Sequence, residues 1–360
     1  MQSVNTSTPV ILGKLPSVER LRIPSRTAQP LHKKRLTVLS VIISALGYLL
    51  LPSCVTIGSG PGFFRSEDYI VYRIKKGDTP AKLAKRFLGD KKKFWLVEDA
   101  NSDVPFTKGH IAVIPLKKEN ACGLRANGFQ VVPILCYHRF SNDVDSPLSM
   151  PPDVFDRQMK YLKENNYRVV SSTDLLGFLQ NEHCLPERAV VITIDDGYRS
   201  VYDIAYPILQ KYGFTATLFI YTDFVGISRN AVTWDQLREM KKSGFQVGGH
   251  TMSHDDLTKQ RDGKDRRSYL ARIEKELGVS KSIIDRKLGQ NTILLAFPYG
   301  RYDLTVLRVA ERTGYEMAVT VKRGSNPFFA NVLALKRSQM LKHDMDSFVS
   351  NLKTFHLVSH

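Results

Sequence analysis

The chain has 360 residues, of which 42% are hydrophobic and 24% charged, as in an ordinary globular protein with room for more than one domain. Its 52 lysines and arginines against 35 aspartates and glutamates give a formal net charge of +17. No zinc-finger spacing, basic helix or RNA-binding signature accompanies this charge, so we expect no nucleic-acid partner. The excess is spread along the chain, which favours contact with anionic envelope polymers or lipid headgroups.

The N-terminal segment has the pattern of a secretory leader. Residues 1–35 are polar and basic, and residues 36–51 form an apolar run that is shorter than the roughly 20 residues of a membrane-spanning helix. The run stops at Leu51-Pro52-Ser53-Cys54, which resembles a bacterial lipobox and implies that a signal over residues 1–53 is removed and Cys54 is acylated. The alternative is an uncleaved N-terminal anchor. Either outcome predicts an extracytoplasmic, membrane-anchored protein of the cell envelope, at the outer membrane or periplasm in a Gram-negative cell.

A linker over residues 54–68 precedes a compact α+β unit over residues 69–116. An alternating strand leads into the turn Gly77-Asp78-Thr79, where Asp78 or Thr79 can cap a helix that begins at Pro80. A second helix and a short closing strand are expected at residues 94–100 and 109–115. The predicted order is therefore strand, helix, helix, strand.

This turn, with Trp95, Asn101 and Ile114-Pro115 at their positions in the unit, resembles a LysM module. The resemblance implies binding to peptidoglycan or a chitin-like glycan. We expect Trp95 and Asn101 themselves to be structural, as a core anchor and a helix stop.

From residue 128 onward, apolar strands alternate with helices. The strands are expected at residues 131–137, 167–171, 189–194, 215–221, 245–249, 292–297, 317–321 and 332–335, and the helices at 152–165, 172–180, 200–212, 233–243, 266–288 and 303–313. This alternation favours parallel pairing in a barrel-like sheet whose C-terminal strand ends converge. Cys136 lies within the first strand and is expected to be a small buried hydrophobe.

Two of these strands end in aspartate or histidine, which are residue types that commonly bind metal ions. One ends at Asp195-Asp196-Gly197, and because adjacent side chains of a strand point to opposite sides, one aspartate can face an ion and the other a substrate. Another ends at His250, with His254 four residues later. Each pattern alone is compatible with an ordinary turn or with structural histidines. Together, one carboxylate and two imidazoles suit a divalent ion with open positions.

A third strand ends at Phe297-Pro298-Tyr299-Gly300. The segments 193–197, 250–254 and 297–300 together resemble the polysaccharide deacetylase family with the NodB homology domain, carbohydrate esterase family 4, over residues 129–345, with a C-terminal tail over 346–360. The resemblance implies a distorted (β/α) barrel and a metal-dependent deacetylase. It also implies that Asp195 is the base and that the metal ligands are Asp196, His250 and His254.

The remaining site residues follow from the chemistry of amide hydrolysis. The backbone N–H of Tyr299, held between the stiff Pro298 and the permissive Gly300, is expected to stabilise the oxyanion together with the metal. Pro298 and Gly300 would border the substrate, and Trp234 offers a sugar-stacking face, although packing at a helix start is the alternative. Zinc is the expected ion, and cobalt or manganese also suits the ligand set.

Two residues depart from the family pattern. Ala296 stands where many members have an arginine that orients the base, and Arg337 stands where a histidine serves as general acid. Arginine cannot donate a proton because its pKa exceeds about 12. We therefore expect His138, at the end of the first strand, to be the general acid; a structural role for His138, or His343 as the acid, is the alternative.

The sequence thus predicts a metal-dependent deacetylase of N-acetylglucosamine-containing envelope polysaccharide, either peptidoglycan or poly-N-acetylglucosamine. Two alternatives stay open. One is a non-catalytic glycan-binding lipoprotein, for which Ala296 and Arg337 leave room. The other is an acetylxylan esterase with the same mechanism.

Overall fold

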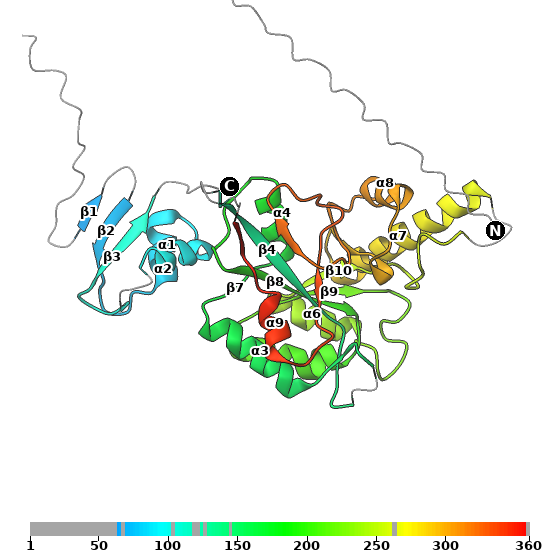
Figure 1. Ribbon diagram of the computed structural model, residues 1–360, viewed down its shortest axis with the longest axis horizontal. Coiled ribbons are helices and arrows are strands. Elements are labelled where there is room, and N and C mark those ends of the chain that lie inside the picture. Colours follow the sequence, from blue (N-terminus) through cyan, green and yellow to red (C-terminus); the bar gives the residue numbers. More distant parts are fainter. Residues whose placement is uncertain are drawn as a thin grey trace, which may run out of the picture. The chain divides into compact units, whose positions relative to one another are not determined.

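The structure is a computed structural model of the chain, and it describes residues 63–65, 69–101, 105–116, 123–124, 128–143, 146–260 and 265–357. The predicted leader and the lipidation site at Cys54 lie outside these residues. Within them, no helix combines the length and the apolar character that crossing a bilayer requires. They form a small three-stranded unit and a larger barrel, which are described separately (Figure 1).

The small unit contains the predicted strand, two helices and strand, with one further strand before them. Its sheet has the antiparallel order β1-β2-β3, and its elements are β1 (Phe63–Arg65), β2 (Tyr69–Arg73), α1 (Pro80–Leu88), α2 (Phe94–Asp99) and β3 (Ile111–Pro115). The Thr79 side chain accepts a hydrogen bond from the Lys82 N–H and begins α1, and Gly89 ends it in a left-handed conformation. Alternate residues of β2 and β3 are buried and pack against the two helices.

Asn101 has the predicted structural role and Trp95 does not. The Asn101 side-chain amide donates to the Val113 carbonyl and accepts from the Val113 N–H, so it ties the end of α2 to β3. Trp95 is only half-buried and lies outside the core cluster of the unit, so its predicted role as core anchor is wrong. The reason is helical spacing: Phe94 and Val97, three residues apart, face the core, and Trp95 points elsewhere.

The barrel domain is built on a curled, mainly parallel sheet, which confirms the predicted distorted (β/α) barrel. The hydrogen-bonded path runs β12-β11-β10-β9-β8-β4-β13, and β7, β14 and β15 attach to β8 or β4. The strands are β4 (Gly128–Tyr137), β7 (Arg168–Val169), β8 (Ala189–Asp196), β9 (Thr217–Ile220), β10 (Gln246–Gly249), β11 (Leu294–Ala296), β12 (Met317–Val319), β13 (Ser325–Pro327), β14 (Ser338–Gln339) and β15 (Phe355–Leu357). Only β13 and β15 run antiparallel to β4 among the described strands of this sheet.

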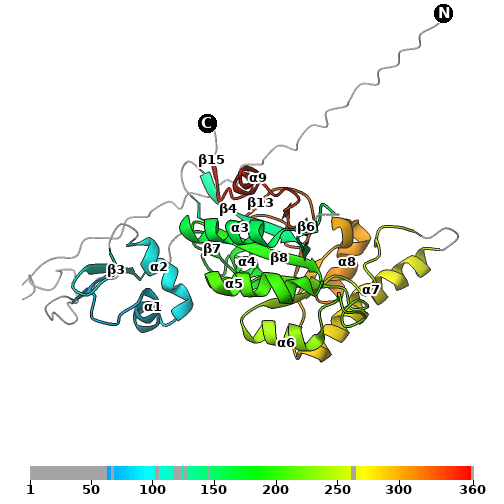
Figure 2. The same cartoon turned by 90° about the horizontal axis from the view of Figure 1, so that it is seen from below.

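Helices surround this sheet at the predicted positions, to within about two residues (Figure 2). They are α3 (Pro152–Glu164), α4 (Ser172–Leu179), α5 (Tyr206–Tyr212), α6 (Trp234–Lys242), α7 (Arg266–Leu288) and α8 (Leu304–Arg312), and one further helix, α9 (Met345–Ser350), was not predicted. The helix predicted at residues 200–212 is α5 preceded by a π-helical turn over Val201–Ala205.

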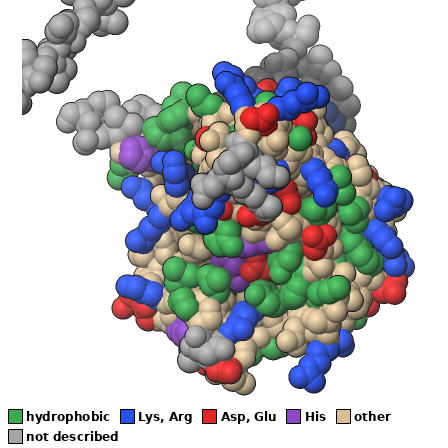
Figure 3. All heavy atoms as spheres, turned by 90° about the vertical axis from the view of Figure 1, so that its right-hand side faces the viewer, with side chains coloured by type: hydrophobic (Ala, Val, Ile, Leu, Met, Phe, Trp, Pro, Cys, Tyr) green, Lys and Arg blue, Asp and Glu red, His purple; other side chains and the backbone are tan. Residues whose placement is uncertain are grey.

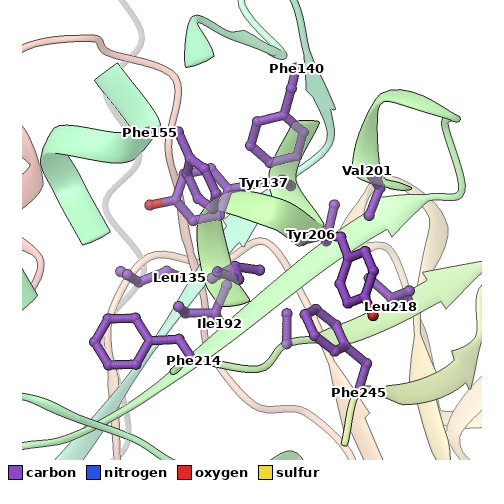
Figure 4. Close-up of a cluster of buried hydrophobic side chains, with 14 of the residues drawn as sticks. Leu135, Tyr137, Phe140, Phe155, Ile192, Val201, Tyr206, Phe214, Leu218 and Phe245 are labelled. Atoms are coloured by element: carbon purple, nitrogen blue, oxygen red, sulfur yellow. The ribbon is translucent and has the colours of Figure 1, made fainter. Parts of the chain in front are cut away.

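The two central strands are buried on both faces and position the site. Every residue of β8 is buried, and its alternate residues belong to two separate hydrophobic clusters. Figure 4 shows one cluster, in which Leu135 of β4 and Ile192 of β8 lie with Phe155 of α3 and Tyr206 of α5. Because this packing fixes both strands from two sides, their C-terminal ends are held at defined positions.

The C-terminal part differs from the sequence prediction in three places, and the first is the presence of β13 and β14, which were not predicted. The strand predicted at residues 332–335 is wrong. The Asn331 side chain accepts from the Leu333 N–H and closes a turn, and the segment meets β12 only through the Val332 carbonyl, which accepts from the Ala318 N–H, and through a single bridge between Leu335 and Val319. The segment expected as a tail after residue 345 contains α9 and β15, and β15 pairs with the start of β4. The barrel domain therefore continues to residue 357.

Candidate active site

The predicted site residues converge at the C-terminal edge of the parallel sheet. Asp195 and Asp196 end β8, His138 follows β4 directly, and His250 follows β10. Asp196 and Gly197 both have positive φ, 74° and 88°, so the chain turns away from the sheet as soon as the carboxylates are delivered. One face of the molecule shows histidine and acidic side chains together near its middle, bordered by hydrophobic side chains (Figure 3).

Asp196, His250 and His254 form a set that fits a divalent metal ion. Asp196 Oδ1 lies 3.5 Å from His250 Nε2 and 3.4 Å from His254 Nε2, and the two imidazole nitrogens are 3.1 Å apart. Ligand atoms about 2.1 Å from a tetrahedral ion are about 3.4 Å from one another. The three donor atoms therefore already have the spacing that such an ion needs, and the donor types match it.

The backbone fixes how His250 faces this site. Its Nδ1 lies 2.8 Å from the Ala296 carbonyl, so Nδ1 carries the proton and Nε2 presents its lone pair to the site. Burial disfavours the charged imidazole, but its hydrogen bond to the Asp196 carboxylate and the charges of both aspartates raise the pKa of His250. Burial and the neighbouring His250 lower the pKa of His254. The surroundings therefore shift the pKa values of the two histidines in opposite directions.

Asp195 is clamped by a buried arginine. Arg337 Nη1 and Nη2 donate to Asp195 Oδ1 and Oδ2 at 2.7 and 2.6 Å, and both side chains are buried. Burial by itself would raise the pKa of Asp195, but the charge and hydrogen bonds of Arg337 outweigh it and hold this pKa well below its usual range. Asp195 therefore stays ionised, which a proton-accepting base requires.

Arg337 thus has a role that the sequence analysis did not assign. In the sequence, Ala296 and Arg337 are two separate departures from the family pattern. In the structure, Arg337 supplies a guanidinium to Asp195 from the segment before β14, and two further hydrogen bonds, to the Thr320 carbonyl and the Thr193 hydroxyl, fix its orientation. Asp195 therefore has an arginine partner even though position 296 is an alanine.

Cys136, His138 and Asp195 form a second convergent group, and it is unsuited to a metal. Arg337 already occupies both oxygens of Asp195 and places a positive charge beside the group. Burial raises the pKa of the Cys136 thiol well above its ordinary value, so the thiolate that a metal needs is disfavoured. Cys136 is a buried residue, as predicted, and its thiol lies 3.7 Å from Asp195 Oδ2.

His138 lies beside Asp195 in this group, whereas the His343 side chain is hydrogen-bonded elsewhere. His138 is buried, and burial lowers its pKa although the charges of Asp195 and Asp196 oppose that effect. His343 Nε2 lies 3.0 Å from the Ser149 carbonyl and donates to it. Of the two candidate acids, His138 is therefore the one whose charge is coupled to both aspartates.

The loop after β11 has a constrained backbone. Pro298–Gly300 forms a 3-10 turn in which Tyr299 and Gly300 have φ of 59° and 65°. A Cβ atom at Gly300 would collide with the backbone nitrogen of Val321, so only glycine fits there. The exposed Tyr299 ring packs edge-on against His254 at 4.8 Å, which brings this turn to the rim of the metal set.

Aromatic side chains that the sequence analysis missed continue this rim. Tyr221, directly after β9, lies 5.2 Å from the His254 ring and stacks on Phe224, which in turn meets Tyr198. The position of Tyr221 at the end of a predicted strand was the signal available for it. Trp234 instead packs against the hydrophobic core at the start of α6, which agrees with the structural alternative.

Comparisons with known proteins agree with this geometry. Residues 182–318 match a family model described as polysaccharide deacetylase. The chain is 31% identical over 251 residues to a protein of Bacillus subtilis described as "Putative polysaccharide deacetylase YxkH", covering 67% of this chain and 85% of that protein. It is 28% identical over 179 residues to a poly-beta-1,6-N-acetyl-D-glucosamine N-deacetylase of Staphylococcus aureus, covering 48% of this chain and 61% of that protein.

Solved structures give the same relationship. The Streptococcus pyogenes deacetylase PplD, in complex with acetate, superposes with a TM-score of 0.57 at 30% identity and covers 62% of this chain and 98% of its own. IcaB from Ammonifex degensii superposes with a TM-score of 0.55 at 25% identity, covering 63% and 97%.

Proposed function

The chain belongs to the polysaccharide deacetylase family, and within that family we propose that it removes acetyl groups from N-acetylglucosamine-containing polysaccharide of the cell envelope, either peptidoglycan or poly-N-acetylglucosamine. The observation that carries the proposal is the pairing of an ionised Asp195 with the adjacent set Asp196, His250 and His254. The name of the staphylococcal relative, which acts on poly-beta-1,6-N-acetyl-D-glucosamine, supports the choice of an acetylated amino sugar.

The residues of the site suggest a division of labour. A divalent ion held by Asp196, His250 and His254, with zinc as the first choice and cobalt or manganese as others, would polarise the acetyl carbonyl and acidify a water molecule. Asp195 takes a proton from the attacking water, and Arg337 keeps its carboxylate ionised for that step.

Two further groups complete the reaction. The Tyr299 N–H donates a hydrogen bond to the oxygen that becomes negative when the amide carbon turns tetrahedral, and Pro298 and Gly300 fix the direction of that N–H. His138 gives a proton to the nitrogen of the leaving amine, so that acetate and a free amino sugar are released.

The hypothesis that the protein is an active enzyme has more support than a non-catalytic glycan-binding role. The sequence argument for lost turnover rested on Ala296 and Arg337, and Arg337 holds the base instead. We also propose that the small domain over residues 69–116 binds peptidoglycan or a chitin-like glycan, and that the protein works outside the cytoplasm at the membrane. Lipidation at Cys54 would provide the anchor.

The test is acetate release from purified peptidoglycan, poly-N-acetylglucosamine and acetylxylan, with metal content measured on the same samples. His250→Ala and His254→Ala should each lose most bound metal and nearly all activity, because each removes one of three protein ligands. His343→Ala is the matched control, since its side chain bonds only to the backbone, and it should keep both. Full metal content in the double variant, or release of acetate from acetylxylan alone, would refute the proposal.

A further inference from the structure

The loop that carries both metal-binding histidines has a backbone that its own sequence does not favour. Thr251 and His254 have φ of 70° and 61°, in the left-handed region. This region is unfavourable for residues other than glycine, above all for a β-branched threonine, and costs on the order of 1–3 kcal/mol per residue. One internal hydrogen bond, from the His254 N–H to Thr251 Oγ1 at 3.0 Å, offsets part of this cost. Contacts from outside the loop must supply the rest.

Glu276 of α7 supplies contacts on the N-terminal side of His254. Its Oε2 accepts hydrogen bonds from the N–H groups of Met252 and Ser253, both at 3.0 Å, and its Oε1 accepts from Ser253 Oγ at 2.8 Å. The side chain is only 5% exposed. A buried carboxylate costs free energy unless it is fully hydrogen-bonded, and here the described partners are all in the metal-binding loop.

Arg272, one helical turn earlier on α7, supplies contacts on the C-terminal side. It pairs with Asp255 at 3.0 Å and donates to the carbonyls of Leu257 and Lys259 at 3.1 and 2.7 Å. Residues four apart lie on the same face of a helix, so both side chains reach the loop together. The Glu276 carboxylate therefore binds backbone N–H groups that precede His254 in the loop, and the Arg272 guanidinium binds backbone carbonyls that follow it.

We propose that Arg272 and Glu276 form a clamp that positions His250 and His254 for the metal, and so sets metal affinity without touching the ion. The inference rests on the proposed metal-dependent function. Without the clamp, the left-handed residues can relax, and the imidazole nitrogens then leave their separation of 3.1 Å, which is close to the spacing that the ion needs. The clamp residues are positioning residues, since neither side chain reaches the reacting atoms.

Glu276→Gln tests the clamp directly. Glutamine keeps the size of the side chain but removes the charge and can turn an amide donor towards the two N–H groups of the loop. We expect the Kd for Zn²⁺, measured by competition with a chromogenic chelator, to rise by about 10- to 100-fold. Saturating Zn²⁺ should restore kcat to near the wild-type value with KM unchanged. Glu274→Gln is the control, because Glu274 lies on the same helix but pairs with Arg312 at the surface.

A simple loss of stability would give a different result. It would lower the melting temperature of the metal-free protein while leaving the Zn²⁺ Kd of the folded protein unchanged, and that outcome overturns the clamp. Arg272→Gln is the second variant and decides the matter if Glu276→Gln does not fold; it too should weaken Zn²⁺ binding. A wild-type protein that binds no divalent ion would instead overturn the proposed function itself, whereas tight wild-type binding that Glu276→Gln leaves intact refutes the clamp alone.

Discussion

Replacing Arg337 with methionine would leave the carboxylate of Asp195 buried without its counter-charge. Methionine fills much of the space of the arginine stem but donates no hydrogen bond. Asp195 would lose both guanidinium hydrogen bonds, at 2.6 and 2.7 Å, in a position where its side chain is almost fully buried. Removing one partner of a buried ion pair costs about 3–5 kcal/mol, because the remaining charge is uncompensated.

The pH dependence of stability should reverse in this variant. In the wild type the pKa of Asp195 is depressed, so its contribution to stability is fully present above its unfolded value of about 3.9 and is lost as pH falls through the folded value. In Arg337→Met, the largest opposing effect is gone, so burial outweighs the remaining charges of His250 and His138 and raises the pKa of Asp195. The folded state then binds the extra proton, and stability falls as pH rises towards that raised pKa.

Urea unfolding at several pH values, with acetate release measured in parallel, checks this reasoning. Turnover at neutral pH should drop by about 10²- to 10⁴-fold, the usual effect of losing a general base, and recover partly as pH rises and Asp195 ionises. The double variant Arg337→Met, Asp195→Asn should regain stability relative to Arg337→Met, since no buried charge remains, and stay inactive. An Arg337→Met protein as stable and as active as the wild type would refute the role assigned to the ion pair.

The other predictions concern single residues of the site. Asp195→Asn should keep its metal and lose about 10²- to 10⁴-fold in turnover. Asp196→Asn should lose metal and activity together and partly recover both in excess metal ion. Metal analysis combined with an acetate-release assay distinguishes the two variants. His138→Ala should lower kcat and remove the alkaline limb of the pH profile of kcat/KM. In the wild type, the pKa that defines this limb should lie below 6.5, because burial lowers the pKa of His138. An unchanged profile in the variant would exclude His138 as the acid. Gly300→Ala should reduce kcat/KM by up to about 10²- to 10³-fold, because the added Cβ meets the Val321 backbone and shifts the Tyr299 N–H; wild-type kinetics would contradict this.

Much of the barrel and the metal set could be predicted from local sequence patterns. Apolar runs of β-branched residues marked β4 and β8, and helical periodicity marked α3, α6 and α7, because burial on a regular element imposes its own period on the sequence. Asp196, His250 and His254 could be grouped because parallel strands deliver their C-terminal ends to one edge. In each case the signal lies within a short window of residues.

Residues whose role depends on distant partners could not be predicted in this way. Arg337 lies 142 residues from Asp195, and nothing around it in the sequence shows that its charge is buried against that carboxylate. Glu276 is one of several acidic residues on a long helix, and only the docking of α7 against the metal-binding loop distinguishes it from Glu274. β15 is three residues long and forms by antiparallel pairing with the start of β4. Periodicity in the sequence determined most of the regular elements, and the strand-end motifs with their family resemblance predicted the metal ligands. The tertiary structure decided which charges are paired and buried, since pairing depends on contacts between distant segments.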